Sequence, residues 1–263
     1  MIGIFDSGVG GMTVAHAIEQ NCPEQHFVYF GDLARTPYGS KSPETIRRYA
    51  RENIKFLLAK GAKLIIIACN SAASVAAEEM RKEFSQPIFD VIGPAVAKVG
   101  QLASDFGSPG RIGVIGTRAT VKSGIYAREI NKISPDLTVS SEACPLLVPL
   151  VEEGWLNHRE TKMVLRRYLR PLKIKQVNAL VLGCTHYPLL TPLIQPRIGK
   201  RVQIIDSSVE VAASLQRYLR QNPINGKNRQ SDRHSEFYVS DITAAAQATA
   251  SRIFGRHIDL IRT

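Results

Sequence analysis

The sequence has no apolar run long enough to cross a bilayer, and we expect no membrane association. No signal peptide is recognisable either, because Asp6 and a glycine cluster interrupt the first strand before an apolar region could form. The four cysteines include no CxxC pair and no dense disulfide framework, which favours free thiols in a reducing compartment. We therefore expect a cytoplasmic protein in which Cys22 and Cys144 are structural or incidental.

Motifs for organic cofactors are missing as well. The glycine-rich turn at residues 6–11 carries Gly8 and Gly10, but the third glycine of a dinucleotide fingerprint would fall at Thr13. The Gly-Lys-Ser/Thr of a P-loop is absent from this turn. No lysine lies within the cysteine motifs described below to form a pyridoxal Schiff base. We expect a protein that works without a cofactor.

Negative charge is scarce relative to positive charge, with 23 Asp and Glu against 34 Lys and Arg, a net charge of +11. The densest basic stretch contains Arg166, Arg167, Arg170, Lys173 and Lys175. Such a cluster can bind nucleic acid regardless of its sequence, but a solvated helix face has the same composition. No helix-turn-helix, RNP-like or zinc-finger signature accompanies it. We expect no specific nucleic-acid site, although a basic surface also attracts a small anionic substrate.

The most informative stretch is an apolar, β-branched run, residues 64–68, that stops abruptly at Cys69 and two small polar residues. The run has the length of a strand buried on both faces, and residues 72–84 after it favour helix. Cys69 is therefore expected near the carboxyl end of a parallel strand, where ligands bind and a helix N-terminus lowers a thiol pKa. A lone cysteine at such a place is often only a small buried hydrophobe.

A second copy of this pattern changes that interpretation. Residues 179–183 form another apolar strand, which ends at Cys184, Thr185 and His186. Each copy is preceded, at a nearly equal distance, by a similar strand that leads into a polar turn: residues 2–5 with Asp6, and residues 112–116 with Thr117. The sequence thus indicates an internal duplication, in which two related α/β halves each present one cysteine to a shared cleft.

The remaining elements continue the alternation of strands and helices, and 44% hydrophobic residues provide an ample core. Further strands are expected at residues 27–30, 87–91, 202–205 and 236–239, and helices at about 43–60, 95–104, 208–219 and 244–254. Two stretches rich in small and polar residues, 107–110 and 221–235, are expected to be loops.

Two thiols on opposite walls of one cleft suit a reaction that needs an acid and a base on opposite faces of one carbon, as stereoinversion does. A free thiol pKa of about 8.5 can be tuned by neighbours, and Asp6 and His186 are the candidates. A zinc site is a weaker interpretation, because Cys184 and His186 have no partner pair of ligands. A cysteine hydrolase with His186 as base is a further alternative, but it leaves one thiol unexplained.

Over nearly its whole length the sequence resembles the cofactor-independent glutamate racemases, within the wider aspartate/glutamate racemase superfamily. The motifs that carry the resemblance are residues 5–11 (FDSGVGG), 31–32 (GD), 37–39 (PYG), 68–72 (ACNSA), 149–152 (PLVE), 183–188 (GCTHYP) and 205–207 (IDS). Family members usually have Thr where this chain has Ser71, which keeps the hydroxyl and loses a methyl group.

The resemblance implies roles for individual residues. Cys69 and Cys184 would be the two proton donors and acceptors, assisted by Asp6 and His186. The residues implied to hold the amino acid are Asp6, Ser7, Pro37, Tyr38, Gly39, Asn70, Ser71, Thr117, Glu152, Thr185 and His186. No metal or cofactor residue is implied.

The resemblance also implies a fold and a biological role. The fold would be two pseudo-twofold-related α/β lobes with mostly parallel central sheets and the active site in the cleft between them. The first lobe would comprise residues 1–93, completed by residues 208–263, and the second residues 94–207. The enzyme would supply D-glutamate for peptidoglycan synthesis, and a homodimer is its candidate assembly. The rivals are an aspartate racemase with a shorter side-chain pocket and, from a different class, a basic regulatory or nucleic-acid-binding protein.

Overall fold

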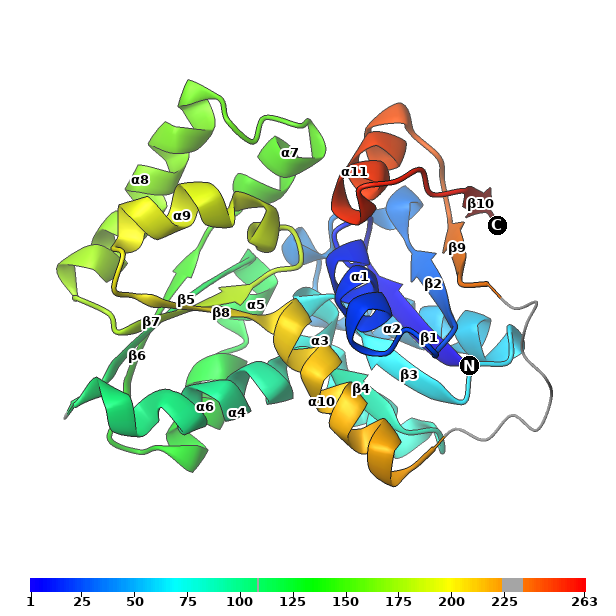
Figure 1. Cartoon of the computed structure of the whole chain (residues 1–263), viewed down its shortest axis with the longest axis horizontal. Helices are drawn as coiled ribbons and strands as arrows, with labels where there is room; N and C mark the ends of the chain where they lie inside the picture. Colours follow the sequence, from blue (N-terminus) through cyan, green and yellow to red (C-terminus); the bar gives the residue numbers. More distant parts are fainter. Residues whose placement is uncertain (108, 224–233) are drawn as a thin grey trace.

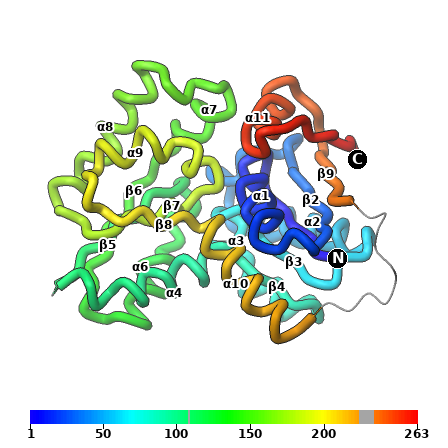
Figure 2. Tube along the Cα trace, in the orientation of Figure 1, coloured from blue at the N-terminus to red at the C-terminus, as the bar shows by residue number. Residues whose placement is uncertain are grey.

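Two parallel β-sheets lie side by side in the structure, a computed structural model that describes residues 1–107, 109–223 and 234–263 (Figure 1). The chain builds most of the first sheet, then the whole second sheet, and returns to the first with its last two strands. Both termini therefore lie at the first sheet (Figure 2). This architecture confirms the predicted α/β class with parallel sheets.

The first sheet has six strands in the order β10-β9-β2-β1-β3-β4, all paired in parallel. Its strands are β1 (Ile2–Asp6), β2 (Phe27–Gly31), β3 (Leu64–Ile67), β4 (Ile88–Asp90), β9 (Glu236–Val239) and β10 (Leu260–Arg262). Every residue of β1 and β3 is buried, because helices cover both faces of the sheet. This burial explains why these strands are continuous apolar runs.

The second sheet has four parallel strands in the order β6-β5-β7-β8. Its strands are β5 (Arg111–Gly116), β6 (Thr138–Ala143), β7 (Ala179–Gly183) and β8 (Gln203–Asp206). In chain order they correspond to β1, β2, β3 and β4, whose order in the first sheet, β2-β1-β3-β4, is the same. The equal strand order supports the internal duplication inferred from the sequence.

Helices cover both faces of the first sheet (Figure 1). On one face α2 (Pro43–Ala59) packs against α3 (Asn70–Glu83), and on the other α1 (Met12–Asn21) packs against α10 (Ser207–Gln221) and α11 (Ala244–Phe254). Helix α10 also contacts α4 (Ile92–Leu102), which belongs to the second half. Helix α10 thus joins the two halves.

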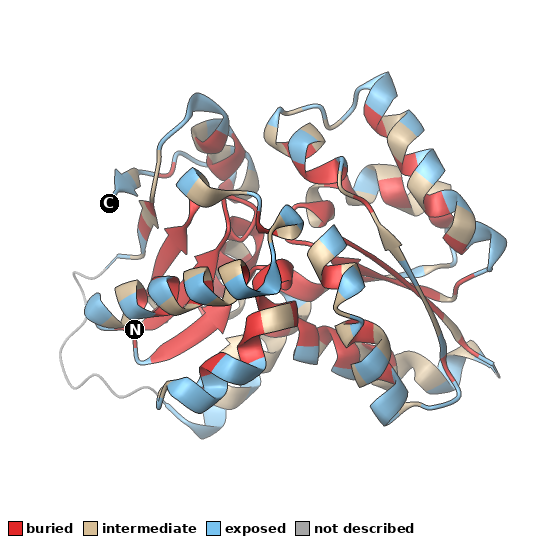
Figure 3. Ribbon diagram, turned by 180° about the vertical axis from the view of Figure 1, so that it is seen from behind, coloured by how far each residue is buried: buried red, intermediate tan, exposed pale blue. Residues whose placement is uncertain are grey.

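The second sheet separates two hydrophobic clusters, because successive side chains of a strand point to opposite faces. Ile112 and Val114 pack into the larger cluster, with α4 and α6 (Ile125–Ile133), whereas Ile115 packs into the smaller one. The helices of the smaller cluster are α7 (Leu147–Glu152), α8 (Arg159–Ile174) and α9 (Thr191–Ile198). Figure 3 shows the buried residues concentrated in the strands and on the helix sides that face them.

Short helices connect these elements. They are α5 (Arg118–Lys122) and the 3-10 helices η1 (Leu33–Arg35), η2 (Tyr38–Ser40), η3 (Ala103–Phe106) and η4 (Tyr187–Leu190). Helix α5 of the second half contacts both η2 and α3 of the first half. None of the helices in the described ranges is long and apolar enough to cross a membrane.

The sequence does not predict β6 and β10. Both are edge strands, and β6 has polar residues at most positions and is only partly buried or exposed, so it lacks an apolar run. Helix α4 begins at Ile92, earlier than expected, because the Asp90 side chain accepts hydrogen bonds from the backbone N–H groups of Ile92 and Gly93 at 2.7 and 2.9 Å. Of the two predicted loops, residues 108 and 224–233 lie outside the described residues.

Candidate active site

The two cysteines follow the equivalent strands β3 and β7 at the carboxyl ends of the two sheets. The pairing of Phe5 with Ile67 places Ser7 level with Cys69, and the pairing of Gly116 with Gly183 places Thr117 level with Cys184. In strand register Ser7, not Asp6, is therefore the counterpart of Thr117. Each thiol is thus accompanied by a hydroxyl from the neighbouring strand end.

Both cysteines line one small cavity of about 20 Å³. Its lining residues are Ser7, Pro37, Tyr38, Gly39, Cys69, Asn70, Ser71, Thr117, Val148, Cys184, Thr185 and His186. All but Val148 are among the site residues predicted from the sequence. Val148 was missed because an apolar residue in a helix carries no signal of its own until the fold brings it to the cavity.

Cys69 is 4% exposed, and its thiol donates a hydrogen bond to Ser7 Oγ at 3.5 Å. Burial, reinforced by the nearby charge of Asp6, raises the pKa of Cys69 to about 12. Cys69 directly precedes α3, and its carbonyl accepts a hydrogen bond from Ala73 N at 2.8 Å. At neutral pH this residue is a protonated thiol fixed at a helix N-terminus.

The second thiol lies beside a histidine. Cys184 Sγ is 3.9 Å from His186 Nδ1, and His186 Nε2 is 3.1 Å from Glu152 Oε1. Burial lowers the pKa of His186, but the hydrogen bonds to Cys184 and Glu152 outweigh it and raise the pKa to about 10. The ring is therefore an imidazolium at neutral pH, and Glu152 orients it toward the sulfur. A side chain at Gly10 would displace it, since a Cβ there would lie 2.4 Å from the ring.

Asp6 is fully buried beneath the cavity and does not line it. Its carboxylate accepts hydrogen bonds from Gly8 N at 2.9 Å and Thr185 Oγ1 at 3.2 Å. Burial raises the pKa of Asp6, and the charge of His186 and these hydrogen bonds oppose the shift. Asp6 thus links the glycine-rich turn of the first half to Thr185 of the second. Glu152 likewise lies outside the cavity lining, behind His186.

Polar side chains from both halves meet on another wall of the cavity. Ser71 Oγ and Thr117 Oγ1 are 2.8 Å apart and join the two halves directly. Asn70 is held by two residues that the sequence analysis did not assign: Tyr126 donates to Asn70 Oδ1 at 2.7 Å, and Asn70 donates to Ser207 Oγ at 3.4 Å. These hydroxyl and amide groups can bind both the ammonium and the carboxylates of an amino acid.

The Tyr38 wall is held from behind by a buried polar network. The Tyr38 hydroxyl donates to Asp32 and accepts from Asn53 Nδ2 at 3.0 Å, while Arg35 Nε donates to Asp32 Oδ2 at 2.7 Å. Burial and the Asp32 carboxylate raise the pKa of Tyr38, so that it remains a neutral phenol. The network fixes the turn that carries Gly39 to the cavity.

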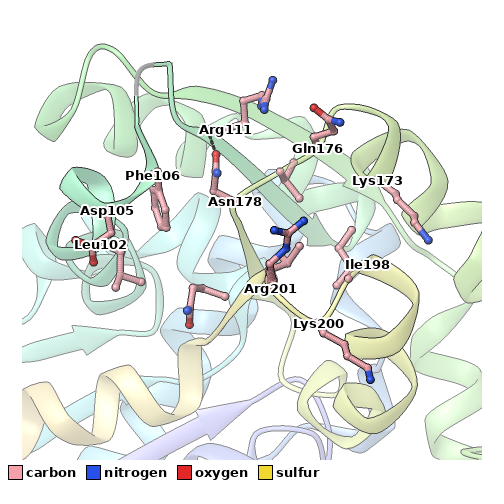
Figure 4. A pocket seen from close by; sticks show the side chains of 14 residues that line it. Leu102, Asp105, Phe106, Arg111, Lys173, Gln176, Asn178, Ile198, Lys200 and Arg201 are labelled. Atoms are coloured by element: carbon pink, nitrogen blue, oxygen red, sulfur yellow. Dashed lines mark hydrogen bonds between the residues drawn. The ribbon is translucent and has the colours of Figure 1, made fainter.

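A much larger cavity, of about 840 Å³, lies elsewhere, at the amino ends of β5, β7 and β8 (Figure 4). Its lining includes Arg111, Lys173, Lys200 and Arg201 but no cysteine or histidine. Size therefore does not identify the reactive site in this protein, whereas the two thiols do. No group of three or more His, Cys, Asp or Glu side chains within the described ranges is placed to hold a metal ion.

Comparisons with known proteins identify relatives over nearly the whole chain. Residues 7–215 match the family model described as Asp/Glu/Hydantoin racemase. The curated glutamate racemase of Geobacter metallireducens is 41% identical over 254 residues, which cover 97% of this chain and 92% of that protein. The crystal structure of glutamate racemase isoform RacE1 from Bacillus anthracis superposes with a TM-score of 0.90 at 32% identity, covering 100% of this chain and 97% of that one. Glutamate racemase from Francisella tularensis in complex with D-glutamate gives a TM-score of 0.90 at 34% identity, covering 100% and 96%.

Proposed function

Since the chain belongs to the Asp/Glu/hydantoin racemase family, we propose that it is an isomerase that interconverts L- and D-glutamate by two-base proton transfer. The observation that carries this proposal is the pair of buried thiols, Cys69 and Cys184, which reach one cavity from the ends of two equivalent strands. The relatives named above support glutamate as the substrate.

The proposed reaction moves one proton at each face of the α-carbon. A thiolate on one wall takes the α-proton, so that the C–H bond breaks and an S–H bond forms. The electron pair remains on the substrate carbon as a carbanion. The thiol on the other wall then gives its own proton to the opposite face of that carbon and becomes a thiolate. The two sulfurs exchange protonation states in each turnover, and no cofactor is required.

The surroundings of the two sulfurs support a division of labour. Cys69 keeps its proton because burial raises its pKa to about 12, which suits a proton donor. Cys184 lies 3.9 Å from the His186 ring, and an imidazolium at that place stabilises negative charge on the sulfur. In the resting state Cys184 would therefore act on L-glutamate while Cys69 delivers the proton that forms D-glutamate. The reverse reaction would begin with the thiolate on Cys69.

The remaining predicted residues would serve binding or positioning. The hydroxyl and amide groups of Ser7, Asn70, Ser71, Thr117 and Thr185 line the cavity and would hold the amino acid. Asp6 and Glu152 would act through Thr185 and His186 rather than by touching the substrate.

We further propose that this activity supplies D-glutamate for peptidoglycan in the cytoplasm. Residues 1–93 with 208–263 and residues 94–207 would form the two lobes, and a homodimer remains a prediction. An aspartate racemase is the second candidate, because such an enzyme would share both cysteines and differ in pocket depth.

The deciding experiment is circular dichroism of D- and L-glutamate and D- and L-aspartate incubated with the purified protein. We expect the optical signal of either glutamate enantiomer to decay to zero, with aspartate much slower. Faster loss of the aspartate signal would favour the second candidate. Retained signal for all four amino acids would refute a racemase.

A further inference from the structure

The cavity between the two thiols is closed to a molecule of substrate size. Its volume of about 20 Å³ is close to the minimum that a single water requires. An amino acid with a side-chain carboxylate is many times larger, so part of the wall has to move before it can bind. The structure indicates which part.

A second hollow of about 580 Å³ adjoins the cavity and shares Gly39 with it. Its other lining residues come from η2 and the start of α2 on one side and from α5 on the other: Ser40, Lys41, Ser42, Pro43, Arg118, Ala119, Lys122 and Ser123, with Val75 of α3. Ser71 lines the cavity and is one helical turn from Val75, which lines the hollow. Thr117 lines the cavity and directly precedes Arg118, which lines the hollow. The cavity and the hollow are therefore neighbours, separated only by the residues that line them.

The barrier between them is a thin contact between the two halves. A Cβ added to Gly39 would lie 2.5 Å from Thr117 Cβ, so the backbone of η2 touches the Thr117 side chain. Beside it, the hydrogen bond between Ser71 and Thr117, 2.8 Å long, completes the barrier. A small separation of η2 from α5 would open the hollow into the cavity.

The hollow is positively charged and its charges are uncompensated. Lys41, Arg118 and Lys122 line it, and no Asp or Glu does. None of the three forms an ion pair with any side chain of residues 1–107, 109–223 or 234–263. A concave surface lined by one sign of charge concentrates ions of the opposite sign.

A carboxylate also lies between the two halves elsewhere, outside the cavity lining. Near Gly8, where a Cβ would lie 3.6 Å from Glu152 Oε1, the two halves meet at a carboxylate. Glu152 is paired with the His186 ring, so its charge is compensated, whereas the cations of the basic hollow have no such partner and attract an anionic substrate.

We propose that the hollow formed by η2, α5 and Val75 is the port through which a dicarboxylic amino acid reaches the thiols, and that Lys41, Arg118 and Lys122 draw its carboxylates in. This inference rests on the proposed function for the identity of its ligand. The port itself can be tested with any small anion that reacts with a thiol.

The test uses alkylation of the cavity thiols by anionic iodoacetate and neutral iodoacetamide. In both reactions the thiolate displaces iodide and a C–S bond forms. The intrinsic reactivity of the thiol therefore affects both rates equally and does not change their ratio. We expect the combined Lys41→Gln, Arg118→Gln and Lys122→Gln variant to lower the iodoacetate-to-iodoacetamide ratio at Cys69 and Cys184 about tenfold at low salt. The wild-type ratio should fall as salt is added, and the two proteins should converge. Mass spectrometry of the labelled peptides separates these sites from Cys22 and Cys144.

A matched control removes the same charge from the distant basic cavity of Figure 4, with Lys173→Gln, Lys200→Gln and Arg201→Gln. This control should keep the wild-type ratio. An unchanged ratio in the port variant, or an equal fall in the control, would overturn the port, since net charge alone would then explain the result.

Kinetics of glutamate racemisation provide the second measurement. The port variant should lose about tenfold in kcat/KM at low salt, with kcat nearly unchanged and a flatter salt dependence. The exposed Ser40→Trp variant should also lower kcat/KM, by obstructing the hollow without adding charge. A Ser40→Trp enzyme with wild-type kcat/KM would contradict the port. The wild-type protein could fail to racemise glutamate while its iodoacetate-to-iodoacetamide ratio still exceeds that of the port variant. In that case the proposed function fails and the port stands.

Discussion

Glu152 and His186 are joined by a contact of 3.1 Å between Oε1 and Nε2, and the opposite ring nitrogen is 3.9 Å from Cys184 Sγ. The carboxylate, the ring and the sulfur thus form a chain of contacts that runs from the partly exposed Glu152 side chain to the cavity. Because the hydrogen bonds at both ends raise the pKa of His186 to about 10, the ring stays protonated at neutral pH and loses its proton as the pH rises toward that value.

Glu152→Gln should weaken this chain. Loss of the carboxylate lowers the pKa of His186 and removes the contact that orients its ring toward the sulfur. We expect kcat for L-glutamate to drop roughly tenfold or more, and the alkaline limb of its pH profile to move to lower pH. The profile of kcat against pH in both directions checks this. An alkaline limb that stays in place would mean that His186 does not carry the effect.

Replacing either catalytic thiol should stop the reaction in both directions. Each direction needs one thiolate and one thiol, so Cys69→Ala and Cys184→Ala should each reduce turnover of L- and D-glutamate by roughly 10³-fold or more. The rates come from the same circular dichroism assay. Cys22→Ala, at a buried cysteine away from the cavity, is the control and should remain active. A Cys184→Ala enzyme that interconverts the enantiomers at near the wild-type rate would refute the two-thiol mechanism.

Reaction in heavy water distinguishes two bases from one. The thiol that delivers its proton has exchanged with solvent, so early product should carry deuterium at the α-carbon while unreacted starting enantiomer stays protiated. Mass spectrometry of the separated enantiomers measures both. Substantial retention of the original proton in early product would indicate a single base that moves between the faces.

Activity should survive removal of small molecules and metals. Extensively dialysed protein is expected to racemise glutamate at its full rate, with or without a chelator, because thiols and polar side chains of the chain itself perform both proton transfers. Recovery of activity only after addition of pyridoxal phosphate, or its loss on chelation, would contradict this expectation.

The excess of positive charge should give only weak retention of DNA. We expect binding that is indifferent to sequence and decreases steeply as salt rises, measured by electrophoretic mobility shift with unrelated duplexes. A footprint at one sequence that persists at physiological salt would show that a specific nucleic-acid site had been missed.

The ends of the two cysteine-bearing strands were predictable because the signal lies within each strand's own sequence. Strands β3 and β7 are buried on both faces, so each is a continuous apolar run that ends visibly at its cysteine. Strand β6 left no such trace, because it lies at an edge and needs few apolar residues. A resemblance to a known family then identified most of the residues that line the cavity.

What the sequence could not predict depends on how the two halves meet. Val148 lines the cavity, while Asp6 and Glu152 lie behind Thr185 and His186. These positions follow from contacts between segments far apart in the chain. The support of Asn70 by Tyr126 and Ser207 has the same origin. The resemblance indicated which groups belong to the site, but not that Asp6 and Glu152 lie behind the residues that line the cavity.

The equal order of strands in the two sheets has a consequence for stereochemistry. Two protein segments built from L-amino acids can be superposed only by a rotation, never by a reflection. The two substrates, however, are mirror images of each other. A site with identical halves would therefore still offer different surroundings to the two enantiomers, so the duplication alone does not make the two directions of the reaction equivalent. The histidine beside one sulfur and the serine hydroxyl beside the other make the two walls of the duplicated fold differ further.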